Sequence, residues 1–328
     1  MLARPTPLPA DIDRLIASAD EILHRQANEG LQLARHALMQ AKTIGYIQGE
    51  ARAGLLLGSA QLILGQQQAA LATFQQALTI AQASSLEKSN LLEQMARSHH
   101  DLGDTPQAAK IWGECAQIAL ENQHFTVFIQ AQIGLGQVHF GFEEYEAALQ
   151  CHYKAFDFLY TSKDPVLRCQ VYINIVMDLY SLARLSEAET MLQRARDISL
   201  SIRHLDNESE IYRISGLLLL QQGDIENART NFASALKICL LQENPWHKAM
   251  SLLGLAHCDL AGQLWHNARI QLDEALTLAT QLQNPHLLCK THHALLLACT
   301  GLEENAAAKI HEIAFAQYKK MLQRPRVC

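Results

Sequence analysis

Residues 57–81 read LGSAQLILGQQQAALATFQQALTIA. In this stretch Ala70 follows Gly58 by twelve positions, and Phe74 follows Ala70 by four. Apolar residues recur at helical spacing on either side of Gly65, which predicts two amphipathic helices joined by a short turn there. Gly58 and Ala70 have small side chains, so they predict where the two helix backbones approach closely. One such hairpin leaves an apolar face uncovered and therefore needs neighbouring hairpins.

The same small residues recur along the whole chain. A small residue followed seven positions later by another occurs eight times, at Gly30/Ala37, Ala70/Ala77, Ala109/Ala116, Ala148/Ala155, Ala188/Ala195, Ala228/Ala235, Ala268/Ala275 and Ala307/Ala314. Successive first members are 39 or 40 residues apart, so the repeat accounts for nearly all of the 328 residues. This repeat outweighs the two or three domains that length alone suggests, because a solenoid grows by stacking units.

The repeat resembles the tetratricopeptide repeat family, whose signature places Leu-Gly in a first helix and Ala-x3-Phe in a second. The matching residues are Leu57-Gly58 with Ala70-x3-Phe74, Leu135-Gly136 with Ala148, and Gly216 with Ala228-x3-Phe232. The step is longer than the family's usual length of about 34 residues, and it is similar to the long-step variant found in bacterial ligand-responsive regulators. The resemblance implies an all-α fold, a right-handed α-α superhelical solenoid of about eight helix-turn-helix units.

This register predicts three segments: a flexible leader at 1–9, the solenoid at 10–323 and a tail at 324–328. The expected units lie near 10–44, 47–83, 88–122, 125–161, 165–202, 207–242, 245–282 and 285–323. Asn-Pro steps open the last two units, because proline stops one helix and begins the next well. Within those two units we expect the turns at Gly262 and Gly301.

Composition excludes several classes of function. The chain has 27 basic and 33 acidic residues, a net charge of −6 and a pI near 6.2, which argues against a nucleic-acid partner. No apolar run is long enough to span a bilayer. The eight cysteines are scattered without a CxxC pair, which is typical of reduced, buried thiols. We therefore predict a cytoplasmic location and no membrane partner.

Candidate chemical groups are few. Cys289 and His293 are four residues apart on one predicted helix, with His257-Cys258 one unit earlier, so metal ligands could converge there. Zinc-type ligand spacing is absent, however, and packing of Cys and His between helices is the favoured interpretation. Glu143-Glu144 falls in a turn, where solvated carboxylates are ordinary. We predict no catalytic residue, no metal, no cofactor and no enzymatic activity.

The family resemblance implies that first helices line a concave groove. It places in the groove the residues one after, three before and six before the close-approach position, which is Gly58 in the second unit. The predicted lining residues are Arg52, Leu55, Ser59, Asn90, Glu93, Arg97, Gln130, Ile133, Gln137, Gln170, Ile173, Met177, Glu210, Arg213 and Leu217. Such a mixed apolar and polar lining favours an internal peptide, an amphipathic segment or a polar small molecule.

Two hypotheses for function remain open. The first is a non-enzymatic scaffold that binds a protein or peptide in the groove of the superhelix. The second is a ligand-sensing regulatory module of a bacterial signalling protein, either a transcription regulator or a cyclic-dinucleotide synthase, whose output domain is absent from this chain. The last predicted helix carries apolar residues where a solenoid usually has a polar cap. We therefore expect self-association through the C-terminal end or a following segment.

Overall fold

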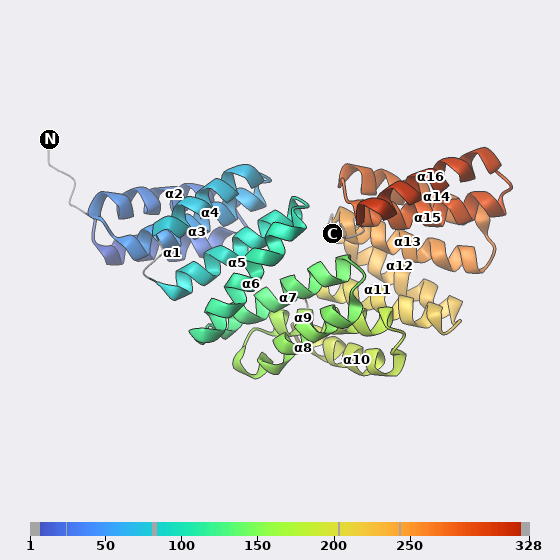
Figure 1. The fold of residues 1–328 in the computed structure, drawn as a ribbon, viewed down its shortest axis with the longest axis horizontal. Coiled ribbons are helices and arrows are strands. Elements are labelled where there is room, and N and C mark those ends of the chain that lie inside the picture. The colour runs from blue at the N-terminus through green and yellow to red at the C-terminus, as the bar shows by residue number, and fades with distance from the viewer. Residues whose placement is uncertain (1–6, 24, 81–83, 203, 243, 323–328) are drawn as a thin grey trace, which may run out of the picture. The chain divides into compact units, whose positions relative to one another are not determined.

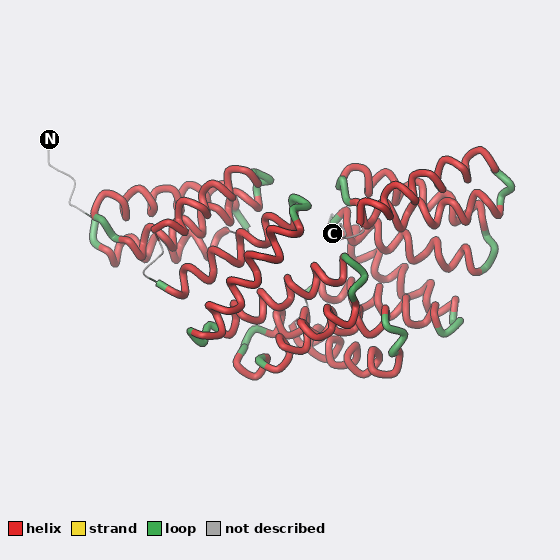
Figure 2. Tube along the Cα trace, viewed as in Figure 1, coloured by secondary structure: helices red, strands yellow, loops and turns green. Residues whose placement is uncertain are grey.

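The computed structural model describes residues 7–23, 25–80, 84–202, 204–242 and 244–322. Within these ranges the chain forms sixteen α-helices and one short 3-10 helix, and it has no strand (Figure 2). The all-α helical-repeat fold predicted from the sequence is therefore confirmed. Residues 1–6 of the predicted leader and the whole predicted tail lie outside the described residues.

Consecutive helices pack against one another as hairpins along the chain (Figure 1). The helices are α1 (Pro9–Leu23), α2 (Ala27–Ile44), α3 (Ile47–Ile63), α4 (Gln67–Ile80), α5 (Ser85–Asp101), α6 (Thr105–Glu121), α7 (Phe125–Gly141), α8 (Tyr145–Asp157), α9 (Pro165–Ser181), α10 (Leu185–Ile202), α11 (Leu205–Gln221), α12 (Ile225–Gln242), α13 (Pro245–Ala261), α14 (Trp265–Gln281), α15 (Pro285–Gly301) and α16 (Asn305–Leu322), with η2 (Leu159–Thr161) after α8. Odd-numbered helices are the first helices of the hairpins and even-numbered helices are the second.

Contacts divide the chain into two compact units, Met1–Val138 and His139–Cys328, and the division falls within α7. In each compact unit most of the buried core side chains are alanine, leucine and isoleucine. None of the described helices combines the length and the apolar character that a membrane-spanning segment requires.

Backbone hydrogen bonds define the repeat register. One small residue in each second helix donates its N–H to the residue four positions earlier, where that helix begins. These residues are Gly30, Ala70, Ala108, Ala148, Ala188, Ala228, Ala268 and Ala308. They are 40 residues apart, except that Ala108 follows Ala70 by 38. The small residue predicted at Ala109 was therefore one residue late, and the one predicted at Ala307 was one residue early. Ala108 rather than Ala109 is fully buried.

Large aromatic side chains explain why glycines recur in the first helices. A Cβ atom added to Gly58 of α3 would lie 2.2 Å from the ring of Phe74 of α4. In the second compact unit, His139–Cys328, a Cβ on Gly254 of α13 would lie 2.2 Å from the ring of Phe232 of α12. Such distances are far below a carbon–carbon contact, so only glycine lets these helices pack around the ring.

The turns between the two helices of a hairpin use glycine in some repeat units and not in others. Gly65, Gly103 and Gly223 have positive φ, as a tight helix–helix turn requires. In the seventh repeat unit the turn contains Gly262, as predicted, but Gly262 has φ −84° and Gln263 has the positive φ. In the eighth repeat unit the prediction was one residue early, because Gly301 is the final residue of α15 and Glu303 has the positive φ. A Cβ on Gly301 would lie 2.3 Å from the Trp265 ring, so this glycine serves packing.

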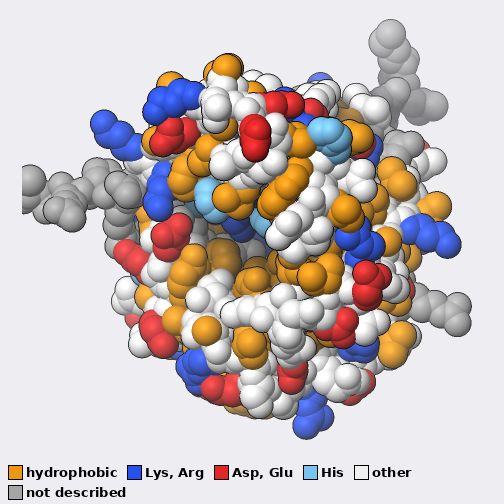
Figure 3. Space-filling view, turned by 90° about the vertical axis from the view of Figure 1, so that its right-hand side faces the viewer, with side chains coloured by type: hydrophobic (Ala, Val, Ile, Leu, Met, Phe, Trp, Pro, Cys, Tyr) orange, Lys and Arg blue, Asp and Glu red, His pale blue; other side chains and the backbone are white. Residues whose placement is uncertain are grey.

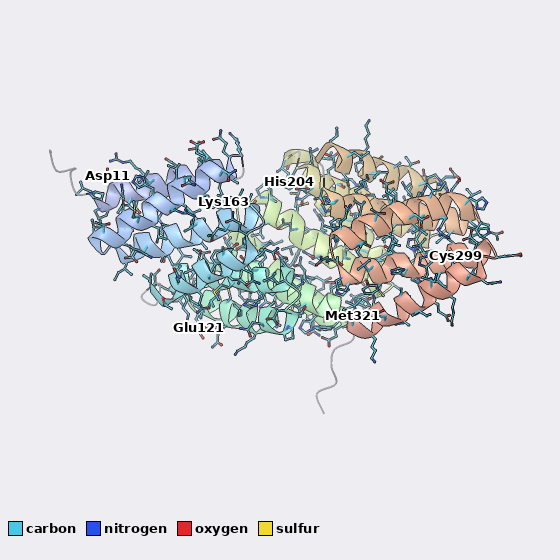
Figure 4. All side chains as sticks on the ribbon, turned by 90° about the horizontal axis from the view of Figure 1, so that it is seen from above. Asp11, Glu121, Lys163, His204, Cys299 and Met321 are labelled. Carbon is cyan, nitrogen blue, oxygen red and sulfur yellow. The ribbon has the colours of Figure 1, made fainter. Side chains whose placement is uncertain are left out.

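Most of the last helix, α16, is exposed to solvent. Among its described residues only His311 is buried, and its Nδ1 lies 3.0 Å from Nδ1 of His292 on α15. Burial lowers the pKa of both imidazoles, and His311 adds to the effect on His292. Ile310, Ile313 and Met321 are exposed; Met321 is labelled in Figure 4.

Candidate functional site

The predicted lining residues all lie on first helices, from α3 to α11, and they differ in accessibility. Glu93, Ile133, Ile173 and Arg213 are buried, and each lies three residues before the close-approach position. This row therefore belongs largely to the packing between helices. The accessible members come mainly from the other two rows: Arg97, Gln137 and Gln170 are exposed, and Arg52, Leu55, Ser59, Asn90, Gln130, Met177, Glu210 and Leu217 are half-buried.

In the first compact unit, Met1–Val138, carboxylates hold the two arginines predicted to line the groove. Arg97 donates to the buried Glu93 carboxylate one helical turn away, at 2.6 Å. The charge of Glu93 raises the pKa of Arg97 above its ordinary value. Arg52 of α3 reaches Asp13 of α1 at 2.9 Å. These ion pairs fix the guanidinium groups and neutralise much of their charge.

The second compact unit contains a more deeply buried ion pair between two predicted lining residues. Arg213 of α11 is only 4% exposed, and its Nε and Nη2 donate to the two carboxylate oxygens of Glu210 at 2.7 and 2.5 Å. Burial by itself lowers the pKa of Arg213, but the Glu210 carboxylate outweighs this effect and leaves the pKa raised. The same pairing leaves the pKa of Glu210 lowered although burial opposes it. Both groups therefore remain charged.

Two predicted lining residues from neighbouring hairpins meet at this pair. Nη2 of Arg213 lies 3.5 Å from Sδ of Met177 on α9. Tyr180, one turn further along α9, also influences the pKa of Arg213. Predicted lining residues of the fifth and sixth repeat units are therefore in contact with each other.

The sequence prediction ended at the sixth unit, although the same spacing extends further. Applied to α13 it gives Met250, Leu253 and His257, and applied to α15 it gives Lys290, His293 and Leu297. Lys290, His293 and Leu297 are exposed, and Met250 and His257 are half-buried. The steady 40-residue step was the signal that could have identified them.

Helix α15 also approaches the beginning of its own compact unit, His139–Cys328. A Cβ on Gly141, at the end of α7, would lie 3.4 Å from Nε2 of His286 in the first turn of α15. The hairpins between these two points therefore curve back toward each other. Figure 3 shows a hollow bordered by hydrophobic and histidine side chains, seen from the side on which α13–α16 lie in Figure 1.

The residues considered as metal ligands have other surroundings. The ring of His293 lies against Phe315, with centroids 4.8 Å apart. Cys258 is fully buried, and burial raises its pKa to about 11. Within the part of the chain that the structure describes, no three His, Cys, Asp or Glu side chains are grouped so that they could hold a metal ion.

Comparisons with known proteins agree with this architecture. Residues 51–84 match the family model described as tetratricopeptide repeat. The structure is similar to that of a Rap protein complexed with competence and sporulation factor, with a TM-score of 0.67 and 11% identity over 95% of this chain and 98% of that one. It is also similar to aspartyl phosphate phosphatase F from Bacillus subtilis, with a TM-score of 0.58 and 13% identity over 98% and 96%. No curated protein matches the sequence.

A third similar structure is a signal-transduction ATPase with numerous domains from Pyrococcus horikoshii, which has a tetratricopeptide repeat sensor. The TM-score is 0.63 and the identity 11%, over 95% of this chain but only 47% of that protein. The chain is thus a helical-repeat solenoid. The tetratricopeptide repeat predicted from Leu57-Gly58 and Ala70-x3-Phe74 is confirmed for residues 51–84.

Proposed function

We propose that the chain is a non-enzymatic scaffold that binds a protein or peptide segment along its first helices. The observation that carries the proposal is the contact between Arg213 and Met177, in which a guanidinium fixed by Glu210 lies beside a half-buried apolar side chain. Small numbers of fixed polar groups within an apolar lining are characteristic of binding sites. The Rap protein to which the chain is similar was crystallised with competence and sporulation factor, which supports an occupant of this kind.

A second candidate is a sensory module of a bacterial signalling protein that responds to a ligand through an output domain. The similar ATPase has a tetratricopeptide repeat sensor, and this chain covers about half of that protein. In this alternative the groove binds a peptide or a small molecule, and the signal passes to a domain absent from this chain. The cytoplasmic location and the self-association through α16 remain predictions in both cases.

The scaffold proposal is tested with a pool of random octapeptides passed over the immobilised protein. Captured peptides are resynthesised with a fluorophore, and their affinity is measured by fluorescence anisotropy. Leu297→Glu places a charge on α15 in the extended lining, whereas Leu240→Glu makes the same change on the second helix α12; the two leucines are 44% and 56% exposed. We expect L297E to weaken binding by about tenfold or more and L240E to change it by less than about twofold.

Circular dichroism of both variants serves as the folding control, because each substitution replaces an exposed side chain. Equal losses in L297E and L240E would contradict the placement of the site on the first helices. Failure of the wild-type protein to retain any peptide would contradict the scaffold proposal itself.

A further inference from the structure

The last hairpin, α15–α16, is joined through histidine and aromatic side chains. Nδ1 of His292 lies 3.0 Å from Nδ1 of His311, and the ring of Tyr318 stacks on that of His292 with centroids 5.7 Å apart. The ring of the neighbouring His293 lies against Phe315, with centroids 4.8 Å apart. His311 is only 8% exposed, and it is the one buried residue of α16. Imidazole groups therefore contribute directly to the packing of α16 on α15.

The preceding hairpin, α13–α14, has apolar side chains at the corresponding positions of its first helix. A step of 40 residues places Leu252 and Leu253 where α15 has His292 and His293. Both leucines are buried in one hydrophobic core cluster. Contacts between hydrocarbon side chains do not change with pH, whereas an imidazole gains a charge just below neutral pH. The last hairpin therefore has titratable groups where its neighbour has a pH-independent contact.

The hydrogen bond between the two imidazoles requires that one ring nitrogen keeps its lone pair. When both rings are neutral, one Nδ1 donates its proton and the other accepts it. One extra proton leaves the bond intact, because the ring that stays neutral is still an acceptor. When His292 and His311 are both protonated, both Nδ1 atoms carry a proton and the bond is lost. Two like charges then face each other, with ring centroids 5.3 Å apart.

The surroundings of the pair disfavour this doubly charged state. Burial is the largest cause that lowers the pKa of His292 and of His311, and His311 lowers the pKa of His292 further. From α14, Arg269 also lowers the pKa of His311, and Asp273 raises it by a smaller amount. Asp273 is itself paired with Arg269, at 3.0 Å. The nearest carboxylate is therefore already used by another cation.

The other elements around the pair add no carboxylate. On α16, Nζ of Lys319 lies 5.5 Å from the centroid of the Phe315 ring, on which His293 of α15 packs from its own side. No described group of α13 shifts the pKa of His292 or His311. Additional positive charge in this hairpin therefore meets burial and neighbouring cations.

We propose that the contact between His292 and His311 is a pH-sensitive switch, and that mild acidification separates α16 from α15. Separation returns both rings to solvent, so the open hairpin binds more protons in acid than the closed one does. The closed hairpin keeps its full stability above the ordinary histidine pKa of 6.5 and loses it as the pH falls through the lowered values. Opening uncovers the apolar cluster against which Tyr318 packs. This switch does not depend on the proposed scaffold function.

Hydrogen–deuterium exchange of the full chain at about pH 7.5 and about pH 5.5 tests the switch, with each exchange rate divided by the intrinsic rate at that pH. For each proton taken up on opening, the opening constant rises by up to about tenfold per pH unit. We expect the protection of α16 to fall by about tenfold or more between the two pH values. The protection of α12, in the same compact unit, should change by less than about twofold.

Variants assign the effect to the two histidines. The double variant H292L/H311Q copies the residues that the preceding hairpin has at these positions, Leu252 and Gln271, and should remove the pH dependence of α16. The matched control His266→Gln removes an exposed histidine of α14 and should keep the full effect. The single variant His292→Gln retains an amide partner for His311 and removes one titrating ring, so α16 should lose less protection than in wild type. This variant also decides the matter if the double variant fails to fold.

Three results would overturn the switch. One is unchanged protection of α16 at the two pH values. Another is an equal fall in α12, since the response to acid would then belong to the whole compact unit. The third is a fall in H292L/H311Q, or in H292Q, as large as in wild type, since the pair would then not be its cause.

Discussion

Replacing His152 with alanine is expected to destabilise the second compact unit by about 3–5 kcal/mol, because the change leaves the buried Asp178 carboxylate without its partner. His152 of α8 and Asp178 of α9 are both almost completely buried, and Nδ1 of the histidine lies 2.5 Å from Oδ2 of the aspartate. Burial raises the pKa of Asp178, and the hydrogen bond to His152 offsets part of this rise. The other carboxylate oxygen, Oδ1, has no hydrogen-bond partner among the described residues.

Urea denaturation of the full chain measures this effect, with Asp178→Asn as the matched control. The asparagine keeps an acceptor for the imidazole and removes the buried charge, so we expect it to cost about 1 kcal/mol. The double variant H152L/D178L removes both polar groups and should be more stable than H152A. A loss below about 1 kcal/mol for H152A would show that the pair does not carry the stability assigned to it.

Phe232→Ala is expected to cost about 3–5 kcal/mol, because it empties the space between two hairpins. Phe232 is fully buried in α12, and its ring faces the glycines of the first helices on both sides. A Cβ on Gly216 of α11 would lie 2.9 Å from the ring, and a Cβ on Gly254 of α13 would lie 2.2 Å from it. Loss of the ring therefore weakens the interface within the sixth unit and the interface with the seventh.

A double-mutant cycle with Gly254→Ala tests this geometry directly. In the wild-type background the added methyl group meets the ring, and we expect a loss of about 1–3 kcal/mol. In the F232A background the methyl group enters the cavity and should be tolerated or mildly stabilising. As a control, Gly113→Ala in α6 meets no atom within 4 Å and should stabilise its helix. Additive effects of F232A and G254A would contradict the packing described here.

The sequence predicted the hairpins well because small residues at a fixed step leave few alternative ways to pack helices. It failed where two neighbouring residues satisfy the same rule. Ala108 and Ala109 are both small, and only the packed structure shows that Ala108 faces the core. The turn predicted at Gly301 was misplaced by one residue for a related reason. A glycine near a helix end predicts a turn, but Gly301 is required by the nearby Trp265 ring.

The site was harder to predict than the fold, because its chemistry depends on contacts between different helices. The spacing rule selects Arg97 and Arg213, but it does not show that Glu93 and Glu210 hold them. The His152–Asp178 pair joins residues 26 positions apart and leaves no signature in the spacing. Lys290, by contrast, lies on the predicted register and was within reach of the same rule.

The most direct test of the account is hydrogen–deuterium exchange of the full chain with and without a captured octapeptide. If the groove of the second compact unit is the binding site, the peptide should slow exchange in the first helices α9, α11, α13 and α15. The second helices α10, α12 and α14 should change little, because they lie on the other side of each hairpin. Protection confined to those second helices would contradict the central claim that this protein binds its partner along the first helices.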